Sequence, residues 1–219
     1  MLQALEAEYS LCERCPDLAQ PRGRDRRHVV MGAGSVDAKV VVVGEAPGKV
    51  EDEEGTPFRQ EAPSGQLLDS LLRTVGRDRS QIWITNVALC WPTEPDESTK
   101  SRKPSAREMK GCRSRLYREI EVVDPYVLLL LGDTAKAALC MEHRTVTSLA
   151  MDPSHPRVTV TVAGQCRTVD RWGIVTFHPS YLLQSNKVAD MSEGGALHRT
   201  VEAFAKAFLI ADTYAEIYR

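Results

Sequence analysis

Short runs of consecutive apolar residues stand out along the chain. Val40–Val43 and Val127–Leu131 contain only valine and leucine, a pattern typical of strands buried on both faces of a parallel sheet. These runs belong to two of the four strands that we predict for a central sheet, at 39–44, 81–86, 126–131 and 173–177. Two alternating stretches, 157–162 and 165–169, surround Ala163-Gly164 and predict a hairpin.

Segments with helical end signals separate these strands. A helix is predicted over Ser64–Val75, with Gly76 as its stop signal. Ser105 and Glu108 have the spacing of a capping box, which predicts a helix that runs to about Glu121. Further helical segments are expected at 2–11, 134–139 and 195–211. Because strands alternate with helices, we predict an α/β fold, a three-layer α/β/α sandwich with a mostly parallel central sheet.

Length and composition support a single globular domain. The chain has 219 residues, of which 42% are hydrophobic, and we expect one domain over 1–219. No apolar stretch has the length that a membrane span requires. The first residues lack the basic and apolar regions of a secretory signal. We therefore expect a cytoplasmic protein that makes no membrane contact.

The distribution of charged residues bears on whether the protein binds nucleic acid. A formal net charge of −2 argues against an indiscriminate nucleic-acid binder. Basic residues nevertheless form two clusters. The first is Arg22–Arg27, and the second consists of Lys100, Arg102, Lys103, Arg107, Lys110, Arg113, Arg115 and Arg118. A solvated helix face is the usual interpretation of such a run, but it can also follow a phosphate backbone.

Six cysteines indicate metal or cluster chemistry, because disulfides are rare in the cytosol. Cys12-x-x-Cys15 alone fits half of a zinc site as well as part of an iron–sulfur site. Cys140 and Cys166 have no regular spacing, and Cys140 is expected to be a small buried apolar residue.

Polar residues end three of the predicted strands. Gly44-Glu45, Asn86 and His178 all stand at carboxyl ends, and ligands of open α/β sheets bind beyond these ends. A phosphate-binding P-loop is excluded at Gly44–Gly48, because three residues rather than four separate the glycines and Val50 follows Lys49. We therefore expect a site at one rim of the sheet.

Four motifs carry a resemblance to a known family. Gly44-Glu-Ala-Pro-Gly48 is followed by Glu51-Asp52 and Gly55-x-Pro-Phe58; the later motifs are Thr85-Asn86-Val87-x-x-Cys90, Leu131-Gly-x-Thr-Ala135 and His178-Pro-Ser-Tyr-Leu-Leu183. In this order they resemble the iron–sulfur uracil-DNA glycosylases, the fourth family of that superfamily. The resemblance implies an enzyme that flips uracil, or another deaminated base, out of DNA and hydrolyses its N-glycosidic bond. It also implies a monomeric, nucleoid-associated protein whose partner is DNA containing uracil.

The resemblance implies a 4Fe–4S cluster held by four cysteines. The implied ligands are Cys12, Cys15, Cys90 and Cys112. The gap between Cys90 and Cys112 is wider than is usual in the family, and we interpret the excess as a surface insertion at Thr93–Lys103.

The resemblance also assigns roles in base recognition and catalysis. His178 would donate a hydrogen bond to uracil O2 as negative charge develops there. Asn86 would accept from N3–H and donate to O4, a pattern that cytosine reverses. Phe58 would stack on the base, although a core phenylalanine is nearly as good an interpretation. Gly44, Ala46, Pro47, Gly48 and Ser180 complete the expected substrate-binding set.

Water attack and strand insertion are assigned to two further groups. Glu45 is the candidate for holding the attacking water, through its side chain or its backbone. Tyr181, Leu182 and Leu183 would form a wedge that fills the gap left by the flipped base.

Three other functions stay open from the sequence alone. The chain could be a non-enzymatic iron–sulfur module that binds DNA, or a redox carrier. It could also be an altered family member that captures DNA covalently, since Arg59–Gly65 departs from the family pattern. That segment contains no histidine, and Glu61 is its one carboxylate able to attack a sugar carbon.

Overall fold

The structure, a computed structural model, describes residues 1–19, 29–94, 100–140, 143–151, 158–163, 168–184, 187–188 and 192–217. Its centre is a six-stranded sheet with the strand order β1-β3-β2-β4-β6-β5. The strands are β1 (Ala33–Gly34), β2 (Val40–Gly44), β3 (Ile82–Asn86), β4 (Val127–Leu131), β5 (Val158–Ala163) and β6 (Thr168–Thr176).

The four inner strands are parallel, and the two edge strands run antiparallel to their neighbours. This confirms the predicted α/β class and the mostly parallel sheet. Gly44 pairs with Asn86, and Leu131 pairs with Thr176. The register therefore brings the carboxyl ends of the inner strands to one rim.

The strand predictions differ from the structure at the two edges. Strand β1 is only two residues long and was not predicted, because so short a segment has no hydrophobic period. Strand β6 is continuous over Thr168–Thr176, so it joins the second half of the predicted hairpin to the last core strand. Gly164 of the predicted hairpin turn and Cys166 lie outside the described residues.

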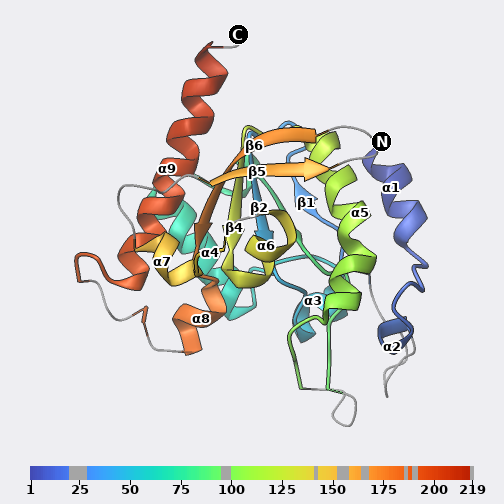
Figure 1. The fold of residues 1–219 in the computed structure, drawn as a ribbon. Coiled ribbons are helices and arrows are strands. Elements are labelled where there is room, and N and C mark those ends of the chain that lie inside the picture. The colour runs from blue at the N-terminus through green and yellow to red at the C-terminus, as the bar shows by residue number, and fades with distance from the viewer. Residues whose placement is uncertain are drawn as a thin grey trace.

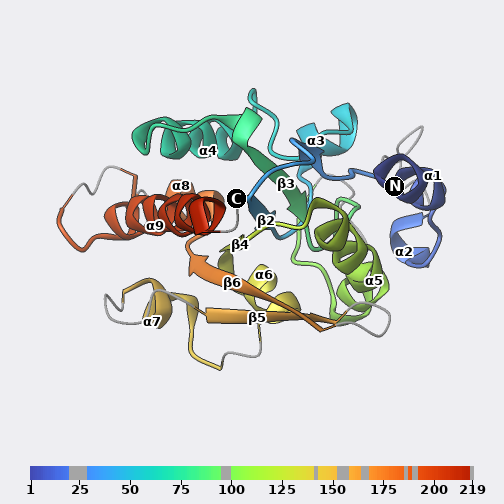
Figure 2. The same cartoon turned by 90° about the horizontal axis from the view of Figure 1, so that it is seen from above.

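Helices cover both faces of the sheet. They are α1 (Leu2–Tyr9), α2 (Pro16–Ala19), α3 (Lys49–Glu54), α4 (Pro63–Thr74), α5 (Ala106–Val123), α6 (Gly132–Leu139), α7 (Val146–Ala150), α8 (Pro179–Gln184) and α9 (Ala196–Ile217), with a 3-10 turn at Arg79–Gln81. Figure 1 shows α9 extending beyond the sheet and α1 lying outside α5. Figure 2 shows α4 and α9 on one face of the sheet, with α5 and α6 on the other. The three-layer arrangement is thus confirmed.

Local signals explain where the main helices begin and end. Ser105 and Glu108 form the predicted capping box, since Ser105 Oγ accepts from the Glu108 N–H at 3.3 Å and Glu108 Oε2 accepts from the Ser105 N–H at 2.7 Å. Gly76, just after α4, has a φ of 69°, which glycine adopts readily. The short helices α3, α7 and α8 were not predicted because one or two turns carry little periodic signal.

The core consists of one large apolar cluster and one small one. The large cluster contains the inner strands and the facing residues of α4, α5 and α9. The small cluster lies between α1 and α5 and includes Leu5, Tyr9 and Leu89. In the part of the chain that the structure describes, no helix combines the length and apolarity needed to cross a membrane.

Candidate active site

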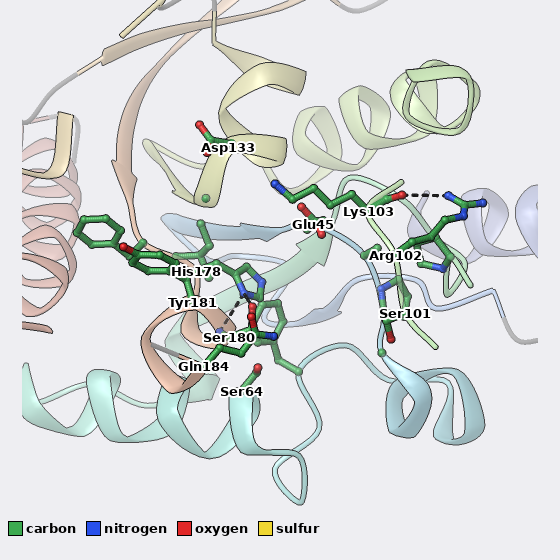
Figure 3. Close-up of a pocket in the computed structure, with 18 of the residues that line it drawn as sticks. Glu45, Ser64, Ser101, Arg102, Lys103, Asp133, His178, Ser180, Tyr181 and Gln184 are labelled. Carbon is green, nitrogen blue, oxygen red and sulfur yellow. Dashed lines mark hydrogen bonds between the residues drawn. The ribbon is translucent and has the colours of Figure 1, made fainter. Parts of the chain in front are cut away.

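A pocket of about 520 Å³ opens at the carboxyl rim of the sheet, within the size range of small-molecule sites. Four segments of the chain supply most of its walls (Figure 3). They contribute Glu45–Gly48 after β2, Leu131–Asp133 after β4, Phe177, His178, Ser180, Tyr181 and Gln184 after β6, and Pro92 with Ser101–Lys103 from the segment before α5. Phe58, Glu51 and Ser64 also line it.

Asn86 adjoins the pocket through Phe58, and its amide has no hydrogen-bond partner among the described residues. Its side chain is 1% exposed, and neither Oδ1 nor Nδ2 has a hydrogen-bond partner among the described residues. A Cβ on Gly44 would lie 2.4 Å from Asn86 Oδ1 and 2.6 Å from Phe58 Cε2. Gly44 therefore lets the amide and the aromatic ring pack against the end of β2. A buried amide without hydrogen-bond partners destabilises the folded chain. A ligand that supplies the missing hydrogen bonds removes this destabilisation.

Phe58 is held in an unusual backbone conformation beside this amide. Its φ is 48°, in the left-handed region, which costs a non-glycine residue about 1–3 kcal/mol. Two side chains fix it: Glu51 Oε1 accepts from the Phe58 N–H at 2.9 Å, and Arg79 Nη2 donates to the Phe58 carbonyl at 2.6 Å. Burial raises the pKa of Glu51, while backbone donors at Gly48 and Phe58 oppose that rise.

His178 follows β6 and presents one defined tautomer. Its Nδ1 accepts from the Ser180 backbone N–H at 3.2 Å and lies 2.8 Å from Ser180 Oγ. Because a backbone N–H can only donate, Nδ1 is the acceptor and the neutral ring carries its proton on Nε2. Burial lowers the pKa of His178 to about 4. At neutral pH the ring is therefore an uncharged donor, and its centroid lies 5.6 Å from that of Phe58.

Glu45 directly follows β2 and lines the same pocket. The Thr134 hydroxyl, at the start of α6, donates a hydrogen bond to Glu45 Oε2. Figure 3 shows Glu45, Lys103 and His178 around the same space. The Glu45 carboxylate, the Lys103 ammonium group and the neutral His178 imidazole thus share the pocket.

The structure gathers nearly all of the predicted substrate and catalytic residues. Glu45, Ala46, Pro47, Gly48, Phe58, His178 and Ser180 line the pocket, and Gly44 and Asn86 adjoin it through Phe58. Glu51, Arg79 and Thr134 were given no role from the sequence. Glu51 and Thr134 stand inside the quoted motifs, but Arg79 lies outside all of them and carries no local signal.

The predicted wedge needs a correction. Tyr181 is 39% and Leu183 is 37% exposed, but Leu182 is fully buried in the large core cluster. The three residues lie on helix α8, and a helix cannot turn three consecutive side chains to one face. Only Tyr181 and Leu183 are therefore available to enter DNA.

The four predicted cysteine ligands belong to one apolar cluster. Cys90 and Cys112 are buried in it, and Cys12 and Cys15 pack against it. A Cβ on Gly111 would lie 3.3 Å from Cys15 Sγ, so a small residue there allows the loop to approach α5. Among the described residues, no group of three or more His, Cys, Asp or Glu side chains is gathered closely enough to hold a metal ion. The donor types and their shared environment nevertheless fit an iron–sulfur cluster.

Cys140 is separate from this group. It is buried in the large core cluster, as expected for a small apolar side chain.

The basic segment is less uniform than its sequence suggests. Arg115 is fully buried and forms an ion pair with Glu119, so the prediction that it follows DNA phosphates is wrong. Arg102 pairs with Glu108 at 2.6 Å, and Arg118 pairs with Glu8 at 2.5 Å. Exposed members with no ion pair to a described residue are Lys103, Arg107, Lys110 and Arg113. Arg22–Arg27 lie outside the described residues.

Comparison with known proteins defines the class. Residues 31–205 match the family model of the uracil DNA glycosylase superfamily. This match covers the sheet, the pocket and most of the helices.

Individual relatives narrow the class. A Type-4 uracil-DNA glycosylase of Thermotoga maritima is 33% identical over 190 residues, covering 84% of each chain. Proteins with the same name are 31% identical in Archaeoglobus fulgidus, over 83% of each chain, and 30% identical in Pyrobaculum aerophilum, over 92% of this chain and 97% of the relative. The chain therefore belongs to the type-4 uracil-DNA glycosylase family.

Proposed function

We propose that this chain recognises uracil in DNA through Asn86 and cleaves its N-glycosidic bond with His178 and Glu45. Membership of the family makes the chain a uracil-DNA glycosylase, a hydrolase of DNA repair. The observation that carries the assignment of residues is the buried amide of Asn86, which has no hydrogen-bond partner in the described part of the chain. It stands beside an aromatic ring and a neutral histidine donor.

The Asn86 amide has the donor and the acceptor that uracil needs. Its oxygen accepts from uracil N3–H and its NH₂ group donates to O4. Cytosine presents an acceptor at N3 and a donor at C4, so a fixed amide would face like groups at both positions. Phe58 supplies a flat apolar surface for the base. Gly44, which has no side chain, leaves room for the Asn86 amide and the Phe58 ring.

His178 and Glu45 divide the chemistry between the two products. As the C1′–N1 bond breaks, its electron pair stays with uracil, and His178 Nε2–H donates to O2 where negative charge develops. Water bonds to the sugar C1′ and gives up a proton, which we assign to the Glu45 carboxylate. Thr134 holds that carboxylate in one orientation. The uracil anion then takes up a proton at N1 from solvent, and Glu45 returns its proton to solvent. The products are free uracil and an abasic site.

The test is excision from oligonucleotides that carry uracil, hypoxanthine or 5-substituted uracil, followed by alkaline cleavage. The wild-type chain should cut at uracil. His178→Ala should lower the single-turnover rate about a hundred- to a thousandfold with little change in DNA affinity. Asn86→Asp should relax the discrimination against cytosine. A full rate in His178→Ala, or unchanged discrimination in Asn86→Asp, would remove that residue from the mechanism.

We also propose that Cys12, Cys15, Cys90 and Cys112 hold a 4Fe–4S cluster. Their shared apolar cluster supports this assignment. The bound cluster would tie the N-terminal segment to α5 and to the loop after β3. The cluster has a structural role in this proposal and takes no part in bond cleavage.

DNA would lie over the mouth of the pocket, and its phosphates would contact the exposed cationic side chains of α5. Lys103 lines the pocket, and Arg107, Lys110 and Arg113 continue from it along the helix. Tyr181, the exposed residue of the predicted wedge that also lines the pocket, would fill the space of the flipped base. We propose that the chain does this as a single domain and a monomer.

A further inference from the structure

The orientation of the Asn86 amide depends on the backbone that carries it. No described side chain or backbone group fixes Oδ1 or Nδ2, so packing and backbone position alone aim them. An amide that is free to shift or flip would lose its preference for uracil over cytosine.

We infer that Arg115 is a positioning residue for uracil recognition, because it fixes the peptide units of Asn86 and Val87 from behind the pocket. This inference rests on the proposed role of Asn86. Arg115 Nη2 donates to the Asn86 carbonyl at 2.6 Å and to the Val87 carbonyl at 3.0 Å. Arg115 is fully buried, and charge-assisted hydrogen bonds in such surroundings are strong and directional.

The guanidinium is itself held in place by partners on two elements. Arg115 Nη1 donates to Thr85 Oγ1 at 2.9 Å and pairs with Glu119. Glu119 in turn accepts from the Thr85 hydroxyl and from Trp83 Nε1, each at 2.9 Å. Arg115 therefore connects α5 to the end of β3 through a buried network.

The other side of the same backbone is fixed by β2. Val87 N–H donates to the Gly44 carbonyl, and Ala88 N–H donates to the Glu45 carbonyl, each at 3.0 Å. The chain that carries Asn86 is thus held between β2 and Arg115. Loss of the Arg115 contacts would leave two buried carbonyls without those donors and release one side of the support.

A lysine at position 115 tests this connection. Its single ammonium nitrogen cannot reach both the Thr85–Glu119 pair and the two carbonyls, whereas the forked guanidinium does. Arg115→Lys should lower the single-turnover rate of uracil excision by about 10- to 100-fold, since small misplacements at a site cost up to about that much. Free uracil should inhibit this variant more weakly, while affinity for uracil-free DNA stays unchanged.

Two variants on the same helix serve as controls. Arg118→Lys makes the same substitution at an exposed arginine that pairs with Glu8, and it should keep the wild-type rate. Leu116→Ala opens a cavity at a fully buried position and removes a side chain that makes no hydrogen bond to the Asn86 backbone. It should lower the melting temperature but keep the rate and the uracil inhibition well below that temperature.

The outcomes separate the inference from the proposed function. A wild-type chain that releases no uracil would defeat the proposed function itself. Wild-type excision with an Arg115→Lys variant of full rate and full uracil inhibition would defeat only the role of Arg115. Equal losses in Arg115→Lys and Leu116→Ala would also overturn it. If Arg115→Lys does not fold, Glu119→Gln tests the same network, and free-uracil inhibition should then weaken several-fold; unchanged inhibition would contradict the inference.

Discussion

His178 shows how one residue can be tuned by its surroundings without a charged partner. Burial lowers its pKa to about 4, and the Ser180 N–H fixes which nitrogen is protonated. A neutral imidazole keeps its proton when it donates a hydrogen bond to uracil. It also carries no positive charge that would slow the release of the uracil anion. This tuning lowers stability in acid, because His178 is protonated less readily in the folded chain than in the unfolded chain.

This difference predicts a pH dependence of stability. Since the folded pKa is about 4 and the ordinary value is 6.5, the unfolded state binds more protons between these values, and folding stability falls as the pH is lowered through them. Between pH 7.5 and pH 5 the wild-type chain should lose about 2 kcal/mol more than His178→Gln. Urea unfolding of both proteins at the two pH values measures this. Equal losses in the two proteins would contradict the assigned cause.

Helix α5 joins three functions at the scale of an element. It carries Cys112 toward the cysteine group, Arg115 toward β3, and exposed cations on its outer side. The sequence identified its capping box and its basic character. It could not separate Arg113 from Arg115, because the direction of a side chain depends on which face of the helix meets the sheet.

The cysteine group gives a prediction at this scale. Cys90→Ser should lose iron and lower the melting temperature together, because the N-terminal segment would be released from α5 and the loop after β3. Cys140→Ser is the matched control, since Cys140 is also buried but lies in the other apolar cluster. Iron and sulfide analysis with thermal unfolding reports both effects. Stoichiometric zinc without sulfide in the wild-type chain would refute the iron–sulfur assignment.

The exposed cations of α5 give a second prediction. Changing Arg107, Lys110 and Arg113 to Gln should weaken DNA binding for all sequences. Each lost phosphate contact should flatten the dependence of log affinity on log salt by about 0.9 on duplex DNA. Arg73→Gln on α4, which lies across the sheet, is the control. A salt slope that does not change in the triple variant would leave α5 as a solvated surface.

At the scale of the whole molecule, the sequence predicted the sheet better than the site. Val40–Val43 and Val127–Leu131 are apolar enough to predict strands without tertiary information. The two hydrogen bonds that hold the Phe58 backbone could not be predicted. Glu51 and Arg79 are far from each other in sequence, and only the tertiary packing brings both side chains to Phe58. The ends of the predicted strands placed Asn86 near Gly44, but only the structure shows that its amide has no hydrogen-bond partner among the described residues.

The segment after Phe58 provides the last prediction. Glu61 is exposed, pairs with Arg59 at 3.0 Å, and is not among the residues that line the pocket. It is therefore poorly situated to attack a sugar carbon. We expect turnover with free uracil and an abasic site, and no protein–DNA adduct on a denaturing gel. An adduct band that disappears in Glu61→Ala would instead indicate covalent capture.

The strand order also has a consequence for how the protein is made. Strand β2 pairs with β3 on one side and with β4 on the other, and β4 is not complete until Leu131. At synthesis rates of about 5–20 residues per second, the interval from Asn86 to Leu131 lasts roughly 2–9 seconds. During that time one edge of the Val40–Val43 segment has no native partner, and such edges associate readily with other chains. Slow translation between these two points should therefore reduce the soluble yield more than slow translation after Leu131.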